Sequence, residues 1–187
     1  FSTGVHKELL CFYSPYYAAA LKGQFAESRQ DSFTLELDHR QTQVFVEWLY
    51  TGRVEEPEDV LQLYMFADQK KLLALRRSIM SKIVYSSVIE KHDGTPYIGH
   101  LSEGCGLFRY MADLWASEWR GVRASYVVQT LNEYQGIPRV FLYEVMRKLA
   151  TIHDQKESEV AIPNPCNYHE HEDDSEWHTS RSKPCPN

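Results

Sequence analysis

Long hydrophobic runs and closely spaced cysteines are missing from this 187-residue sequence. No apolar stretch approaches the roughly 20 residues that a membrane-spanning helix needs. No signal peptide is recognisable, although the chain begins at Phe1 and not at methionine. Cys11, Cys105, Cys166 and Cys185 lie far apart without a C-x-x-C pair, and no N-x-[ST] acceptor occurs. These absences argue against a membrane partner and favour an intracellular location, in the nucleus or the cytoplasm.

An excess of positive charge and the motifs of common enzyme families are also missing. The net charge of −6 argues against a surface that binds nucleic acid directly. There is no G-x-G-x-x-G loop, P-loop, H-E-x-x-H helix or G-x-S-x-G elbow. We therefore expect no catalytic residues, no enzyme activity and no resident cofactor, but the hydrophobic content of 43% is enough for a folded core.

Instead, residues 6–52 carry a dense series of local folding signals. Apolar residues at helical spacing predict a first short helix over 6–13. Ser14 and Pro15 then separate it from a second helix, because serine caps helix N-termini and proline suits the first helical position. Gly23 is expected to end this second helix.

An alternating pattern predicts a strand soon afterwards. The apolar Phe33, Leu35 and Leu37 alternate with the polar Thr34 and Glu36. Because successive side chains of a strand point to opposite faces, the pattern predicts one buried and one exposed face.

A longer helix is predicted between Asp38 and Gly52. Asp38 followed by Gln41 is close to a capping box, and Gly52 suits a left-handed helix end. Trp48 lies on a wide apolar stripe at helical spacing and is expected in the core.

Two more helices are predicted by apolar residues at three- and four-residue steps, one after Pro57 and one from Leu72 onward. Interleaved with them is a group of basic residues that we expect on the solvated face and not in a nuclear-import signal. This group consists of Lys70, Lys71, Arg76 and Arg77.

Four short motifs follow one another in residues 1–87: VHK at 5–7, SPYY at 14–17, FAES at 25–28 and WLYTG at 48–52. In this order they closely resemble the BTB/POZ domain, specifically its fungal type. The resemblance implies an α+β fold in which a small sheet packs on a helical cluster. It also implies a protein-interaction module without an active site.

The resemblance to this family also implies which partners to expect. Its members commonly form homodimers, and many bring a target to a cullin-type ubiquitin ligase. Others act as co-regulators or assembly modules in transcription, and this alternative stays open. In the family a strand pair precedes the VHK motif, whereas only residues 1–5 do so here, so we expect a truncated domain without its first strand.

Phe25-Ala26-Glu27 fits the hydrophobic-x-Glu pattern that contacts the cullin in ligase-adaptor members of the family. The resemblance therefore makes Phe25 and Glu27 candidate partner-binding residues. The triplet is common by chance, and in the alternative Phe25 caps the core while Glu27 is solvated.

The rest of the chain is expected to form a linker over 88–106, a helical extension over 107–153 and a disordered tail over 154–187. In the extension, Trp115 and Trp119 are expected to pack together. The tail has eight acidic and three basic residues and few apolar ones. Its composition is too polar for a packed core.

The tail also holds the chain's one metal-like cluster. Cys166, His169, His171 and Cys185 are ligand types that zinc favours, with His178 between them. Their spacing matches no standard zinc finger. The two interpretations are a structural zinc site and scattered histidines in an acidic tail.

Overall fold

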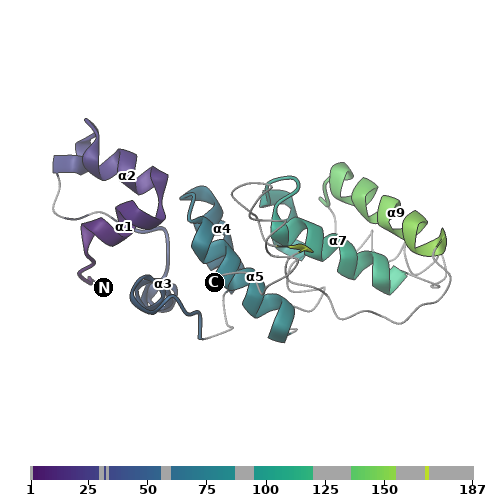
Figure 1. Cartoon of the computed structure of the whole chain (residues 1–187). Coiled ribbons are helices and arrows are strands. Elements are labelled where there is room, and N and C mark those ends of the chain that lie inside the picture. Colours follow the sequence, from purple (N-terminus) through teal and green to yellow (C-terminus); the bar gives the residue numbers. More distant parts are fainter. Residues whose placement is uncertain are drawn as a thin grey trace. The chain divides into compact units, whose positions relative to one another are not determined.

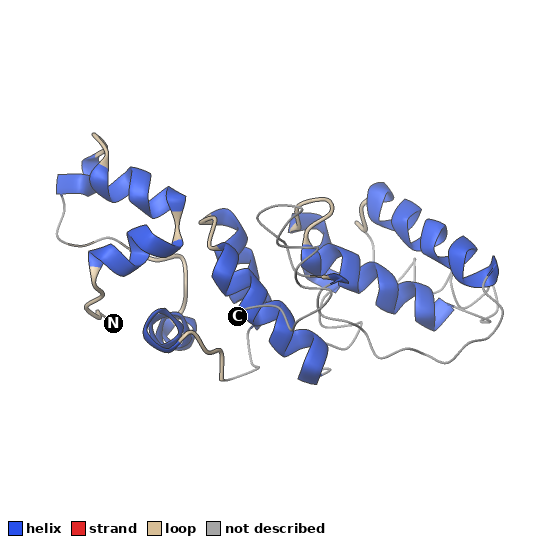
Figure 2. Cartoon of the chain, viewed as in Figure 1, coloured by secondary structure: helices blue, strands red, loops and turns tan. Residues whose placement is uncertain are grey.

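The structure is a computed structural model of the whole chain. It describes residues 2–29, 32, 34–55, 60–86, 95–119, 136–154 and 167–168. Two compact units divide the chain: the first comprises Phe1–Ser86 with His169–Asn187, and the second comprises Ser87–Tyr168. The predicted linker and helical extension both fall in the second unit. All regular elements among the described residues are helices (Figure 2).

The first unit begins with two short helices, α1 (Lys7–Tyr13) and α2 (Pro15–Lys22), which pack against each other (Figure 1). Ser14, fully buried between them, caps α2 by accepting a hydrogen bond from the Tyr17 backbone N–H at 3.2 Å. Proline occupies the first helical position. The break and restart predicted at this point are confirmed.

Helix α3 (His39–Thr51) carries the predicted signals at both ends. Asp38 accepts from the Gln41 N–H at 2.8 Å, and Gln41 accepts from the Asp38 N–H at 3.1 Å, which completes a capping box. Gly52 follows the helix in the left-handed region with φ +70°. Trp48 is 1% exposed, so its predicted place in the core is confirmed.

Helices α4 (Val60–Gln69) and α5 (Leu73–Ser86) pack together after a tight turn. The Leu72 N–H bonds to the Ala67 carbonyl at 2.8 Å and the Lys71 N–H to that of Asp68 at 3.2 Å. This is a Schellman ending, with Lys71 in the left-handed position at φ +55°.

The core of the first unit lies between α3, α4 and α5. Phe45 meets Phe66 edge to face with ring centroids 5.1 Å apart, and Trp48 donates its indole N–H to the Ser78 hydroxyl at 3.1 Å. The predicted stripes of α4 and α5 are buried. Their buried members include Val60, Leu61, Tyr64, Ala67, Leu72, Leu75, Ile79 and Ile83.

The predicted strand is not confirmed. Residues 34–37 have no strand conformation and bend at Glu36 and Leu37, and the small sheet is not seen among the described residues. The alternation nevertheless shows in the burial: Thr34 and Glu36 are exposed, whereas Leu35 and Leu37 are half-buried. A strand needs a hydrogen-bonded neighbour as well as an apolar face, and the sequence pattern reports only the face.

The prediction that the basic residues lie on a solvated face is wrong for Arg76 and only partly correct for Lys70. The Arg76 guanidinium donates to Asp68 at 2.5 Å, and both side chains are largely buried, at 14% and 12% exposed. Lys70 lies over the ring of Tyr16 with its Nζ 4.9 Å from the centroid. Of the four basic residues, Lys71 is exposed and the others are half-buried.

The second unit contains η2 (Thr95–His100), α7 (Gly106–Trp119) and α9 (Arg139–Asp154), with α7 and α9 side by side (Figure 1). Phe141 of α9 meets Trp115 of α7 at 5.4 Å between ring centroids. Trp115 and Trp119 are buried with their rings 5.1 Å apart, so the predicted packing role of this pair is confirmed.

Three further observations describe this unit. Met146 of α9 is 66% exposed, while Phe141 and Val145 of the same helix are fully buried. Lys148 joins α9 to α7 through an ion pair with Asp113 at 2.6 Å. Tyr168 lies within the predicted tail but is buried, with its ring 5.2 Å from that of Tyr110.

Among the described helices, none is sufficiently long and apolar to cross a bilayer.

Candidate partner-binding site

The predicted partner-binding residues lie at a short turn after α2. A single turn of 3-10 helix, η1, spans Ala26–Arg29 and packs against α2. The Phe25 carbonyl at its start accepts from both the backbone N–H and the hydroxyl of Ser28, at 3.2 and 2.7 Å. Two hydrogen bonds on one carbonyl fix the backbone that carries Phe25.

Phe25 is exposed to 60%, so it does not cap the core. The alternative that the sequence left open is therefore wrong for this residue. The backbone of Glu27 belongs to η1, and its side chain lies outside the described part of the chain.

Gly23 is what allows the chain to turn toward Phe25. A Cβ at this position would lie 2.3 Å from the Ala19 carbonyl oxygen and 3.2 Å from the Phe25 ring. The Gly23 N–H bonds to the same Ala19 carbonyl at 2.9 Å. Because the backbones approach so closely, any side chain here would displace the turn that presents Phe25.

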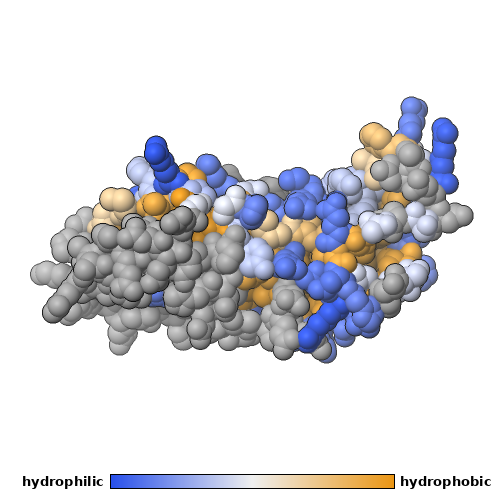
Figure 3. Space-filling view, turned by 180° about the vertical axis from the view of Figure 1, so that it is seen from behind, coloured by the Kyte–Doolittle hydropathy of each residue, from blue (hydrophilic) through white to orange (hydrophobic). Residues whose placement is uncertain are grey.

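Two more aromatic side chains of the first unit face solvent near the junction of α1 and α2. Phe12 is 79% exposed and Tyr16 45% exposed. The Lys70 ammonium rests over the Tyr16 ring and lies 4.0 Å from Glu36. Hydrophobic residues reach the surface between hydrophilic ones in the space-filling view (Figure 3). Exposed aromatic rings held by packed helices are typical of protein-binding surfaces.

Beside Tyr16, the hydroxyl of Tyr17 is held in its neutral form. Burial raises its pKa, and the neighbouring Tyr16 and Glu36 raise it further. Tyr17 therefore belongs to the scaffold beneath the surface and contributes no charge to it.

The structure does not test the predicted zinc site. Cys166, His169, His171 and Cys185, with His178, all lie outside the described residues. Within the described residues, no three or more His, Cys, Asp or Glu side chains gather as a metal site would require. Cys11 and Cys105 are buried free thiols.

The sequence did not reveal how exposed Phe25 is or which residues hold it. Gly23 and Ser28 were available as signals, since a glycine after a helix and a serine three residues beyond an aromatic residue favour a turn. Such signals locate the turn but cannot show which way its aromatic ring points.

Residues 2–87 match the family model of the BTB/POZ domain. This part of the chain is therefore similar to BTB/POZ domains, which are protein–protein interaction modules. The match is to the family as a whole, so the fungal type stays a prediction. No solved structure matches the chain.

Proposed function

We propose that this protein is a self-associating BTB-type adaptor that brings a target to a cullin-type ubiquitin ligase. The turn at Phe25-Ala26-Glu27 would contact the cullin scaffold. The proposal locates the protein inside the cell, in the cytoplasm or the nucleus, and assigns it no catalytic step of its own.

The observation that carries the proposal is the exposure of Phe25 on a fixed turn. A phenylalanine exposed to 60% leaves apolar area in water, which is regained when a partner covers it. Because two hydrogen bonds to its carbonyl and the close approach at Gly23 hold the turn, little conformational entropy is lost on binding. A rigid aromatic anchor of this kind is typical of binding hot spots.

A ligase adaptor also needs a surface for its target. Helix α9 of the second unit offers one, since Tyr143 and Met146 are exposed to 68% and 66% on the side opposite to the buried Phe141 and Val145. We assign target binding to the second unit on this basis.

The test is direct binding of the full chain to the N-terminal region of a cullin-type scaffold, measured by titration calorimetry. Phe25→Ser should weaken binding by about tenfold or more, as expected for loss of a hot-spot aromatic residue. Glu27→Lys should weaken it comparably, because it replaces an acid with a base. Tyr143→Ser is the matched control, an equally exposed aromatic residue of the other unit, and should bind like the wild type.

Binding by both variants as tight as that of the wild type would remove the cullin role. Chromatin components recovered with the full-length protein, without cullin components, would favour the alternative of a transcriptional co-regulator or assembly module.

A further inference from the structure

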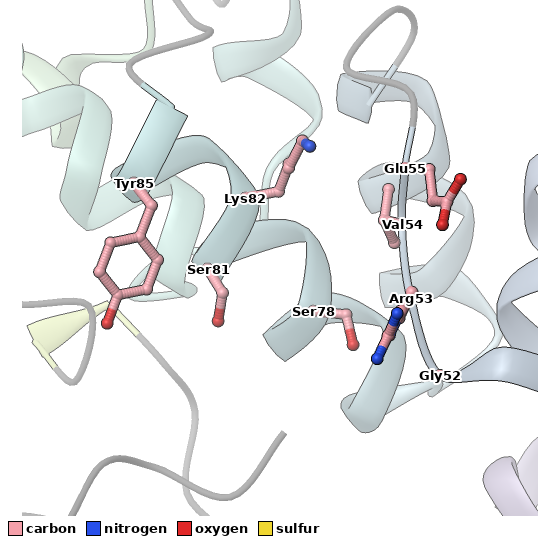
Figure 4. Close-up of a pocket in the computed structure, with 8 residues that line it drawn as sticks. All are labelled: Gly52, Arg53, Val54, Glu55, Ser78, Ser81, Lys82 and Tyr85. Atoms are coloured by element: carbon pink, nitrogen blue, oxygen red, sulfur yellow. The ribbon is translucent and has the colours of Figure 1, made fainter.

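A second surface feature of the first unit lies away from the Phe25 turn. A pocket of about 520 Å³ opens between the loop that follows α3 and one side of α5 (Figure 4). Its lining residues are Gly52, Arg53, Val54 and Glu55 on the loop and Ser78, Ser81, Lys82 and Tyr85 on α5.

Two cations from separate elements line this pocket. Arg53 comes from the loop and is exposed, and Lys82 comes from α5 and is half-buried. Neither side chain forms an ion pair with another residue in the described part of the chain. Among the described lining residues Glu55 is the one carboxylate, so these residues together carry a charge of about +1, on a chain whose net charge is −6.

The wall on α5 adds hydroxyl groups at helical spacing. Ser78, Ser81 and Tyr85 share one side of the helix with Lys82, since residues three and four apart are neighbours on a helix surface. The Ser78 hydroxyl already accepts the indole N–H of Trp48 and donates to the Ala74 carbonyl at 3.0 Å, so it is a fixed part of the wall. Tyr85 is 75% exposed and stands at the rim.

The loop wall is held in place as well. Gly52 takes the left-handed conformation that ends α3, and the Arg53 N–H bonds to the Thr51 hydroxyl at 3.1 Å. Val54 is buried to 8% exposure and anchors the loop to the core. Arg53 therefore projects from a backbone whose position is set before any ligand arrives, which lowers the cost of binding.

We propose that this pocket binds an oxyanion, a phosphate or a carboxylate, carried by a side chain of a partner peptide. Arg53 would supply the planar fork that suits a two-oxygen contact, and Lys82 would supply a second positive charge. Tyr85 would donate a hydrogen bond from the α5 wall. A nucleic acid fits less well, because a polyanion needs a run of cations, and the described lining residues include two within an acidic protein.

The inference rests on the proposed role in protein binding but not on the cullin contact. The pocket and the Phe25 turn share no residue, so the anion-binding proposal and the cullin proposal can be refuted separately. A protein that binds the cullin fragment but no anionic peptide would overturn this inference alone.

The probes are four biotinylated peptide libraries that differ only at one fixed central residue: phosphoserine, phosphothreonine, glutamate or serine. Binding of the full-length chain is measured by biolayer interferometry. We expect the phosphorylated or the glutamate library to bind and the serine library not to bind. Comparing the phosphorylated libraries with the glutamate library separates phosphate recognition from carboxylate recognition. Added salt should weaken the interaction.

Variants then assign the binding to this pocket. Arg53→Gln and Lys82→Gln should each weaken it by about tenfold, since each removes one charged contact to the anion. Lys22→Gln makes the same charge change at an exposed residue outside the pocket and should leave binding unchanged. Glu55→Gln should strengthen binding several-fold, because it removes the one negative charge among the described lining residues.

A gain in the Glu55→Gln variant cannot arise from misfolding, so the test holds even if a loss-of-charge variant is unstable. Equal binding to the serine library would overturn the proposal. So would folded Arg53→Gln and Lys82→Gln variants that bind like the wild type. Equal affinity for a single-stranded oligonucleotide would also overturn it, by showing a general polyanion surface.

Discussion

Ser14 joins two parts of the first unit through one buried hydroxyl. Its Oγ accepts from the Tyr17 N–H at the start of α2 and donates to the Lys70 carbonyl at the end of α4, at 2.5 Å. The side chain is both a helix cap and a long-range tie across 56 positions of sequence. The sequence predicts the cap, since Ser-Pro is a local signal, but not the tie.

Ser14→Ala should lower the free energy of unfolding by about 2 kcal/mol, the sum of a lost N-cap and a lost hydrogen bond. Urea denaturation of the full chain followed by circular dichroism measures it. Ser2→Ala, an exposed serine before α1, is the control and should change little. If Ser14→Ala lowers the free energy of unfolding no more than the control does, the hydrogen bonds of Ser14 do not stabilise the fold.

Tyr17 gives a prediction about alkaline pH. Burial, with Tyr16 and Glu36 nearby, raises its pKa above the ordinary value of 10.0, so the unfolded chain gives up this proton at lower pH than the folded chain does. Its contribution to stability is therefore complete below about pH 10 and is lost as the pH rises above that value.

Between about pH 9 and about pH 11, the free energy of unfolding should fall less in the Tyr17→Phe variant than in the wild type. Some loss should remain, because burial also raises the pKa values of Tyr110 and Tyr168. Tyr85→Phe, at an exposed tyrosine, serves as control. A Tyr17→Phe variant with the same alkaline slope as the wild type would contradict the account of the buried hydroxyl.

At the scale of elements, the helix ends could be predicted from the sequence and the strand could not. Ser14, Asp38 with Gln41, and Gly52 act on backbone groups within a few residues, so their spacing alone determines the cap. Strand formation at 34–37 requires a neighbouring strand that the local sequence does not specify. The Asp68–Arg76 pair was missed for a similar reason, since it forms across the turn between α4 and α5.

Gly52 tests how much a single left-handed residue contributes to α3. A Cβ at Gly52 would meet nothing within 4 Å, so Gly52→Ala changes only the backbone preference at φ +70°. We expect a loss of about 1 kcal/mol, measured by the same denaturation experiment. Gly4→Ala, in equally open space without a positive φ, should cause almost none. Equal effects of the two substitutions would contradict a conformational cause.

On the scale of the whole molecule, the two units have different expected tasks. The first contains the BTB/POZ match over 2–87, the Phe25 turn and the pocket at Arg53 and Lys82. The pocket could not be predicted from the sequence, because only the packing of α3 and α5 brings residues near 53 and 82 together. The partner-binding residue Phe25 was predicted from a family resemblance, and its exposure required the structure.

Self-association is the first prediction at this scale. Sedimentation velocity of the full chain should show a species of about twice the 21.8 kDa chain mass as the concentration rises. Phe12→Ser should weaken this association, because Phe12 is the most exposed aromatic residue among the described residues of the first unit. Tyr143→Ser, on the second unit, should leave it unchanged. A monomer at every concentration would contradict the prediction.

The central claim is that the first unit works by contact through a fixed surface. The most direct measurement is quantitative affinity purification of the full-length protein from its own cells, with the wild type compared to Phe25→Ser and to the Tyr143→Ser control. The account predicts a reproducible partner, with cullin components first among the expected ones, that is lost with Phe25→Ser and retained with Tyr143→Ser. The Tyr143→Ser variant should lose only targets that bind through the second unit. An identical set of recovered proteins for the wild type and a folded Phe25→Ser variant would contradict it.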